Sequence, residues 1–345
     1  MAAEATTDWS SLPADLASRI ADCFLAANDL DYYIDFRAVC HNWRAATTDP
    51  KTSQDPRFRP SRWIMLDEAS STDARVFVNT TTGRFLRKDL PLLRRYHMVV
   101  SNTGGFLVLA DRNPPHAPLV LNPFTGSMIR FKAPPVRSEF DLTADVVGDS
   151  PTLLLATRSA HDKFVFHLAD PDSEHFIFRE DAELEADEFS DSIRYSMLAL
   201  CSVTVELAPG EMAIVRKGQR QGVDLFRKNS ATMAMDRVTS IGSRALFLGR
   251  RCVSIDAGNF PTIEANCVYY KKSDDPCMYM YDLALDEEER IDKSYSYPPT
   301  ILQLIFSYTT NVPIYLLPWE NSTESFIKSL QSINFWEFCE LLKEV

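Results

Sequence analysis

The chain has 345 residues with 45% hydrophobic and 24% charged side chains, a balance typical of a globular protein and not of a disordered or fibrous one. Its length predicts two domains, or one large domain with a small appendage. Acidic residues exceed basic ones by 48 to 36, and the net charge of −12 disfavours general binding to nucleic acid or to an anionic membrane surface.

The sequence predicts neither a signal peptide nor a membrane-spanning helix. Met1–Ser10 has no basic start and no apolar stretch, and no window approaches the roughly 18 apolar residues of a membrane helix. Seven scattered cysteines without a CxxC pair indicate reduced thiols. We therefore expect a protein of the cytoplasm, the nucleus or both, with no membrane and no nucleic acid among its partners.

Apolar residues in the first fifty positions follow helical spacing. A first helix face is predicted by four-residue spacing at Leu12, Leu16 and Ile20, with Pro13 in the first turn. A second face is predicted by the spacing i, i+3, i+4 and i+7 at Phe36, Val39, Cys40 and Trp43. A unit of about 40 residues is normally too small to be stable alone, so these faces need a second body, either the rest of the chain or a partner.

Two sequence blocks within residues 9–47 are distinctive. They are Leu12-Pro13-Ala14-Asp15-Leu16 and, more specific, Asp35-Phe36-Arg37-Ala38-Val39-Cys40-His41-Asn42-Trp43-Arg44. Together they resemble an F-box, the module that docks on the Skp-type adaptor of cullin-RING ubiquitin ligases. The resemblance implies adaptor contacts at Leu12, Pro13, Leu16, Ile20, Val39, Cys40 and Trp43.

Two other interpretations of this segment are open. It could be a helical hairpin that packs on the next domain, or a helix-turn-helix that binds DNA. Residues 1–50 carry eight acidic and three basic side chains, and that excess of negative charge argues against DNA.

The amino-acid composition and the predicted secondary structure change after residue 47. Lys51–Arg62 is polar and contains Pro56 and Pro60, which predicts a linker over 48–61. From 62 to 318 the chain consists of short β-rich runs separated by turn residues, such as Gly105–Ala110 and Asn266–Tyr270. We expect an all-β domain there.

A repeat lies inside this β-rich part. Val76–Leu86 aligns with Leu119–Ile129, which places Asn79 and Asn122 43 residues apart, and a weaker third copy follows at 164–178. Each copy is a strand, an Asx-type turn and a strand. A period of about 40 to 50 residues made only of strands is typical of four-stranded propeller blades, and 62–318 would hold about six. The alternative is an all-β sandwich whose hairpins match by chance.

A second resemblance supports the propeller. Ser240–Gly249, Asn266–Tyr270 and Tyr281–Leu283 are similar to a plant-specific propeller family that commonly follows an F-box and was long catalogued only as a domain of unknown function. Beyond it, 319–345 carries apolar residues at helical spacing, which predicts a terminal helix that covers a blade edge or a partner.

Enzymatic motifs are absent from the sequence. It has no GxGxxG, P-loop, HExxH or GxSxG pattern, and we expect no catalytic residues, no metal and no cofactor. The one grouping that could supply metal ligands is His161, His167 and His175 with Asp162, Asp170 and Asp172. Alternating strands with polar faces explain the same residues.

The expected fold is a small all-α F-box over 9–47, a linker over 48–61, an all-β propeller of about six four-stranded blades over 62–318, and a short C-terminal helix over 319–345. The expected function is that of the substrate-recognition subunit of an SCF-type ubiquitin ligase, with the F-box on the adaptor and the propeller on a target protein. The alternatives are a propeller-based hydrolase and an interaction scaffold that recruits no ligase.

Overall fold

The structure is a computed structural model that describes residues 9–310 apart from 54, 67–72, 102–104, 115, 135–141, 148–150, 159–163, 181–202, 209–210, 218–222, 229–234, 273–274, 276 and 292–299. The helix expected over 319–345 lies outside the described residues. In the described part, no helix is long and apolar enough to cross a bilayer.

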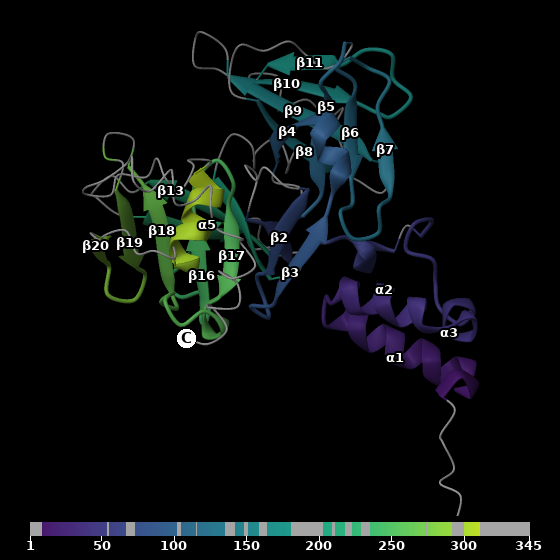
Figure 1. The fold of residues 1–345 in the computed structure, drawn as a ribbon. Helices are drawn as coiled ribbons and strands as arrows, with labels where there is room; N and C mark the ends of the chain where they lie inside the picture. Colours follow the sequence, from purple (N-terminus) through teal and green to yellow (C-terminus); the bar gives the residue numbers. More distant parts are fainter. Residues whose placement is uncertain are drawn as a thin grey trace, which may run out of the picture.

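Three helices form the N-terminal end of the described chain (Figure 1). They are α1 (Ala14–Ala26), α2 (Leu30–Val39) and α3 (His41–Ala45), preceded by the 3-10 turn Trp9–Ser11. The second predicted helix is broken, because Cys40 is extended with φ −154° and ψ 166°. Trp43 therefore lies on a separate short helix, and the predicted face from Phe36 to Trp43 is not continuous.

Beyond residue 62 the described chain is mainly β-structure. Its strands are β1 (Trp63–Met65), β2 (Ala74–Asn79), β3 (Phe85–Asp89), β4 (Tyr96–Ser101), β5 (Leu107–Asp111), β6 (Pro118–Leu121), β7 (Met128–Arg130), β8 (Leu142–Val147), β9 (Thr152–Arg158), β10 (Phe164–Ala169), β11 (Ile177–Glu180), β12 (Val203–Ala208), β13 (Glu211–Lys217), β14 (Val223–Lys228), β15 (Met235–Val238), β16 (Arg244–Phe247), β17 (Val253–Asp256), β18 (Cys267–Lys271), β19 (Met278–Asp282) and β20 (Glu287–Ile291). The short 3-10 turns Pro56–Phe58, Pro91–Arg95 and Ala257–Asn259 and the helix α5 (Ile301–Thr310) complete the described elements.

The described strands form four sheets, with orders β1-β2-β3, β11-β10-β9-β8-β4-β5-β6-β7, β12-β13-β14-β15 and β17-β16-β18-β19-β20. The eight-stranded sheet consists of two antiparallel meanders, joined where β4 and β8 pair in parallel at Val100↔Thr143. The last sheet also has one parallel pair, β16 with β18, because β17 lies on the far side of β16.

The expected number of six blades is not confirmed by these four sheets. Dividing the length by a repeat period assumes that every 43 residues make one blade. The chain departs from that assumption because 301–310 form a helix. The repeat period therefore predicted strand-built units, but not their number.

The turns of the repeat are as the sequence predicted. Asn79 Oδ1 accepts hydrogen bonds from the backbone N–H groups of Thr81 and Thr82 at 2.9 and 3.0 Å. Asn122 Oδ1 does the same for the residues two and three positions further, at 3.0 and 3.2 Å. Each turn ends four residues after its Asn with a glycine in the left-handed region, Gly83 at φ +70° and Gly126 at φ +71°. Asx-turn chemistry thus sets both hairpins.

A third turn of this kind lies where the alignment did not place it. Asp282 Oδ1 accepts from the N–H groups of Ala284 and Leu285, and Asp286 takes the glycine position at φ +60°. The third copy expected at 164–178 is a hairpin, β10 with β11, but a different turn closes it, in which Ser173 N donates to Asp170 O.

The two glycines of the repeat form a matched pair for substitution. A Cβ at Gly126 meets nothing within 4 Å, whereas a Cβ at Gly83 would lie 2.9 Å from the backbone oxygen of Asn259. Gly126→Ala is expected to cost about 1–2 kcal/mol, because only the left-handed conformation is strained. Gly83→Ala is expected to cost more, because the backbone around Asn259 must also move. Urea unfolding of both variants measures the difference, and equal losses would contradict it.

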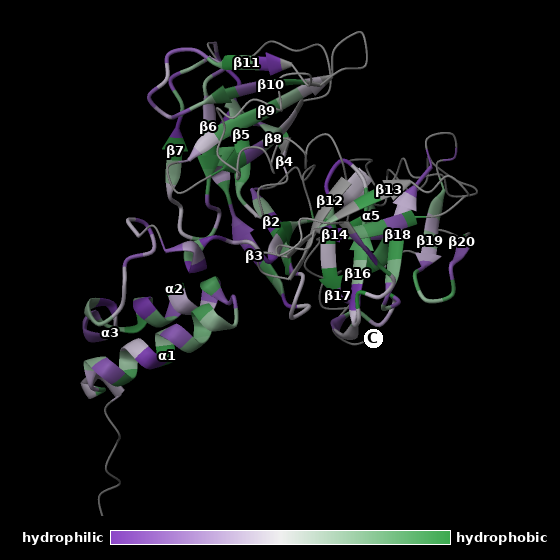
Figure 2. Cartoon of the chain, turned by 180° about the vertical axis from the view of Figure 1, so that it is seen from behind, coloured by the Kyte–Doolittle hydropathy of each residue, from purple (hydrophilic) through white to green (hydrophobic). Residues whose placement is uncertain are grey.

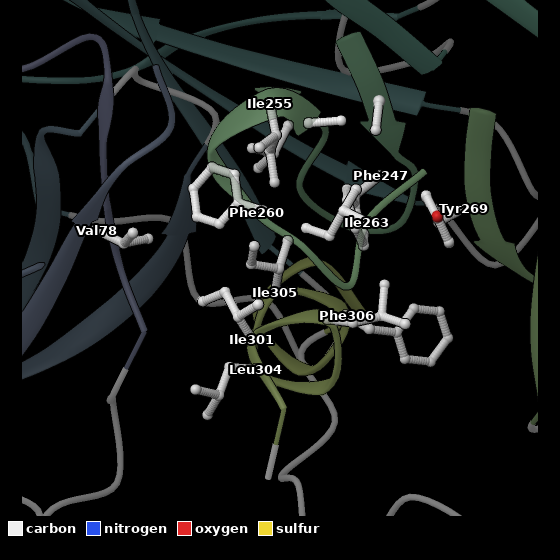
Figure 3. Packing of buried hydrophobic residues seen from close by; sticks show 14 of the residues in the cluster. Val78, Phe247, Ile255, Phe260, Ile263, Tyr269, Ile301, Leu304, Ile305 and Phe306 are labelled. Atoms are coloured by element: carbon white, nitrogen blue, oxygen red, sulfur yellow. The ribbon is translucent and has the colours of Figure 1, made fainter. Parts of the chain in front are cut away.

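Helix α5 joins the first and last sheets. It lies in the region where only strands were expected, and it buries Ile301, Leu302, Leu304, Ile305 and Phe306. These side chains belong to one apolar cluster with Ile64, Val76 and Val78 of the first sheet and Phe247, Ile255 and Tyr269 of the last (Figure 3). Residues from both ends of the β-rich part therefore share a core.

Candidate protein-interaction surface on the N-terminal helices

The apolar stripe predicted on the first helix is only partly the face that packs inside the protein, since Leu12 packs against the core but the other two residues do not belong to it. Leu16 and Ile20 are 39% and 40% exposed. The buried face of α1 lies one position further along the sequence, at Ala17, Ala21 and Leu25. Helix α1 thus has two adjacent apolar faces, one buried and one only partly covered within this chain. Figure 2 shows hydrophobic and hydrophilic positions mixed along α1. The open face is available to another protein.

The remaining predicted adaptor residues divide into two groups. Pro13 is exposed and Val39 is 62% exposed. Leu12, Cys40 and Trp43 are half-buried. Trp43 stacks on Phe36 with ring centroids 4.3 Å apart, and its Nε1 donates to the backbone oxygen of Trp9 at 3.1 Å.

The buried faces of the helices pack against the first sheets. Ala17, Ala21, Leu25, Leu30, Tyr33 and Phe36 belong to one cluster with Phe58, Trp63, Met65, Phe77, Leu93, Tyr96, Leu107, Leu109, Leu119, Leu121 and Phe124, named here the shared cluster. The segment 48–61, expected as a polar linker, contributes Phe58, whose ring centroid lies 5.2 Å from that of Tyr33. The helices and the β-rich part therefore have one continuous core between them.

A charged network lies beside the shared cluster. Arg84, which directly precedes β3, reaches the start of α2: its Nη2 lies 3.0 Å from Asp29 Oδ1 and donates to Asp31 Oδ2 at 3.0 Å. Lys88 Nζ lies 3.7 Å from Asp31 Oδ1. The four side chains are only 13% to 23% exposed. The Arg84 guanidinium also lies 3.8 Å from the ring centroid of Tyr32, close enough for a cation–π contact.

The two carboxylates of this network are not equivalent. Asp29 Oδ1 accepts no hydrogen bond, so Arg84 pairs with it by charge alone, whereas Asp31 receives a hydrogen bond as well. Burial raises the pKa of Asp29 above its ordinary 3.8, Arg84 opposes that shift, and Asp31 adds to it. The net direction means that ionised Asp29 is less stable in the fold than in water.

Replacing each carboxylate by its amide should separate the two roles. The folded state holds the Asp29 proton more tightly than the unfolded state, so stability from this group is present below pH 3.8 and is lost as the pH rises through the raised value. Asp29→Asn is therefore expected to keep or raise stability at pH 7. Asp31→Asn should lose about 1–2 kcal/mol, since a charge-assisted hydrogen bond is removed. Thermal unfolding at pH 7 and pH 5 measures both, and a larger loss for Asp29→Asn would contradict this assignment.

The histidine grouping considered for a metal is only partly described, since His161 and Asp162 lie outside the described residues. Of the others, Asp170 accepts from Thr152 Oγ1 at 2.6 Å and Asp172 pairs with Lys132 at 2.8 Å. Burial lowers the pKa of His167. Within the described ranges, no three His, Cys, Asp or Glu side chains are close enough to share a metal ion.

A cavity of about 310 Å³ lies between the helices and the β6–β7 turn. Its lining consists of Ile34, Arg37, Ala38, Arg44, Asp49, Pro50, Lys51, Phe124 and Thr125. Arg37 is committed to structure there, since its Nη1 donates to the Thr48 carbonyl at 2.7 Å and also to the Thr47 carbonyl. With one carboxylate and neither histidine nor cysteine, this lining lacks the paired groups that acid–base or nucleophilic hydrolysis needs.

Sequence reasoning missed several residues of this region. Trp9 and Tyr32 are 65% and 45% exposed and extend the apolar surface of the helices. Their aromatic character was the only signal in the sequence. Arg84 was missed altogether, because its partners Asp29 and Asp31 are more than fifty positions away in the chain.

Comparison with known proteins bears on the β-rich part. Residues 181–296 match a family model described as the KIB1-4 beta-propeller. The β-rich part of this chain is a β-propeller. The matched segment covers β12 to β20, and the sheets β1 to β11 precede it. A search of curated proteins finds no match.

Similarity to solved structures is distant. The WD40 domain of SCAP from fission yeast is 12% identical with a TM-score of 0.24, over 66% of this chain and 52% of that one. The β-propeller domain of the Trilobed protease from Pyrococcus furiosus is 15% identical with a TM-score of 0.21, over 66% and 67%. A complex of the fission yeast SREBP–SCAP binding domains is 11% identical with a TM-score of 0.23, over 68% and 61%. The chain spans about half to two thirds of the length of these proteins.

Proposed function

We propose that this protein is a substrate receptor of an SCF-type ubiquitin ligase. In this proposal residues 9–47 are an F-box that binds a Skp-type adaptor and, through it, a cullin-RING ligase. The propeller binds the target protein. A β-propeller is a common platform for protein–protein contact, and the sequence blocks around Leu12 and Val39 resemble the F-box.

The observation that carries the proposal is the second apolar face of α1. A helix that packs on its own domain normally exposes polar residues on its opposite side. Here Leu16 and Ile20 lie on a face next to the buried one, where they are 39% and 40% exposed, and both are positions that the F-box resemblance assigns to the adaptor. Val39 at the end of α2 adds a third exposed apolar side chain at an assigned position.

In this role the protein performs no bond chemistry of its own. It holds a target close to the ubiquitin-charged enzyme, so a bimolecular encounter becomes effectively intramolecular. The shared cluster supports this use, because it connects the adaptor-binding helices to the propeller through a packed core. A receptor needs such a connection if the target is to be presented at a defined distance.

The direct test is a binding measurement between the purified full-length chain and a purified Skp-type adaptor. We expect a stable complex that also retains the cullin in co-purification from cells treated with a proteasome inhibitor. A complex with the adaptor but without the cullin would indicate the scaffold alternative. Absence of adaptor binding by a folded chain, with turnover of a glycoside or ester substrate panel, would indicate the hydrolase alternative and overturn the proposal.

A further inference from the structure

The helices meet the propeller through two kinds of contact. On the helical side the shared cluster combines small side chains, such as Ala17 and Ala21, with large ones, such as Tyr33, whose ring centroid lies 5.2 Å from that of Phe58. Packed side chains of different size interlock and resist sliding. The cluster therefore holds the helices on the propeller, and polar contacts at its edge add to the definition of their angle.

Arg84 makes the polar contacts. It bridges two carboxylates at 3.0 Å and covers the ring of Tyr32, so three of the four residues from 29 to 32 are held by one side chain. On its own domain the guanidinium lies 5.2 Å from the ring centroid of buried Trp63. The charge-assisted hydrogen bond to Asp31 depends on direction as well as distance, whereas the pairing with Asp29 is by charge alone.

The position of Arg84 in the sheet explains why it can do this. Residues 84, 86 and 88 share one face of the β3 segment: Leu86 packs against the shared cluster and Lys88 pairs with Asp31. Residues 85, 87 and 89 point to the other face, where Phe85 packs against the α5 cluster and Arg87 is exposed. One strand thus contacts the helices with alternate side chains.

We propose that Arg84 is a positioning residue that fixes the orientation of the N-terminal helices on the propeller. The consequence for function rests on the proposed receptor role, because a fixed orientation sets where a bound target lies relative to the adaptor. The orientation itself is a property of this chain alone. It can be measured without adaptor or target.

The experiment measures a distance distribution within the full-length chain. Spin labels are attached through a non-cysteine handle at two exposed positions, Arg19 on α1 and Asn113 after β5, and pulsed electron resonance records the distances between them. The unsubstituted chain should give a single narrow peak. Arg84→Gln should broaden or split it, while circular dichroism shows unchanged secondary structure. Arg87→Gln, on the opposite face of β3, is the matched control and should keep the narrow peak.

The variant Arg84→Lys tests whether a positive charge at this position is sufficient. Arg84→Lys keeps a cation that can pair with Asp31 and lie over Tyr32, so it should recover most of the narrow distribution. A distribution that stays narrow in Arg84→Gln overturns the proposal, as does one that broadens as much in the control Arg87→Gln as in Arg84→Gln. Adaptor affinity of the same variants is measured in parallel. Loss of adaptor binding by the unsubstituted chain would overturn the receptor role and leave the orientation result intact.

Discussion

Replacing Leu16 and Ile20 by aspartate is expected to weaken binding to the Skp-type adaptor strongly while the chain stays folded. Neither side chain is a member of the shared cluster, so the substitution leaves the core of this protein in place. In the complex each would bury its exposed two-fifths, worth about 0.6–1.2 kcal/mol, and two such losses weaken binding by roughly 10- to 50-fold. The introduced carboxylates add a desolvation cost.

The matched control is Ile177→Asp. Ile177 is 57% exposed on β11, outside the N-terminal helices, so its substitution should change neither folding nor adaptor affinity. Isothermal titration with purified adaptor gives both affinities, and near-ultraviolet circular dichroism verifies the fold. A folded double variant that binds adaptor as tightly as the unsubstituted chain would remove α1 from the interface.

Cutting the chain between the helices and the propeller is expected to leave the two pieces associated. A specific protease site inserted between Lys51 and Thr52, both exposed in a turn, allows cleavage of the folded protein. The fragments should co-elute in size-exclusion chromatography, because the shared cluster and the Arg84 network lie on both sides of the cut. A polar linker between independent domains would release them.

Expressing residues 51–345 alone tests the same contact from the other direction. Without the helices, buried side chains such as Phe58 and Trp63 face water, and each large side chain re-exposed costs about 1.5–3 kcal/mol. That is a large fraction of the roughly 5–15 kcal/mol that stabilises a domain, so this fragment should aggregate or bind hydrophobic dyes. Two fragments that separate and remain folded would show that the helices are an independent domain.

Local chemistry explains which parts of the fold the sequence predicted. The turns at Asn79 and Asn122 were predicted correctly, because an Asx-turn is made by residues within five positions of one another. The copy at Asp282 was missed, since Asp replaces Asn there and Asp286 replaces the glycine. The same backbone geometry thus arises from a different pair of residues.

Other features depend on contacts that no local pattern reveals. Helix α5 was missed because nearly all of its side chains are buried, and an almost continuous apolar run shows neither helical nor strand periodicity. The stripe of Leu16 and Ile20 was found, but its exposure follows from the packing of Ala17 and Ala21 on the propeller. Spacing alone cannot tell which of two adjacent apolar faces a protein buries.

The order in which the two clusters form during synthesis follows from their places in the chain. All members of the shared cluster lie between residues 17 and 124, so the N-terminal helices can settle on the first sheets while later residues are still being added. The cluster around α5 instead combines Ile64, Val76 and Val78 with residues up to Phe306. Those three side chains can be packed against α5 only after more than half of the protein has been translated. Until α5 emerges from the ribosome, they form an apolar surface that a chaperone or another nascent chain can occupy.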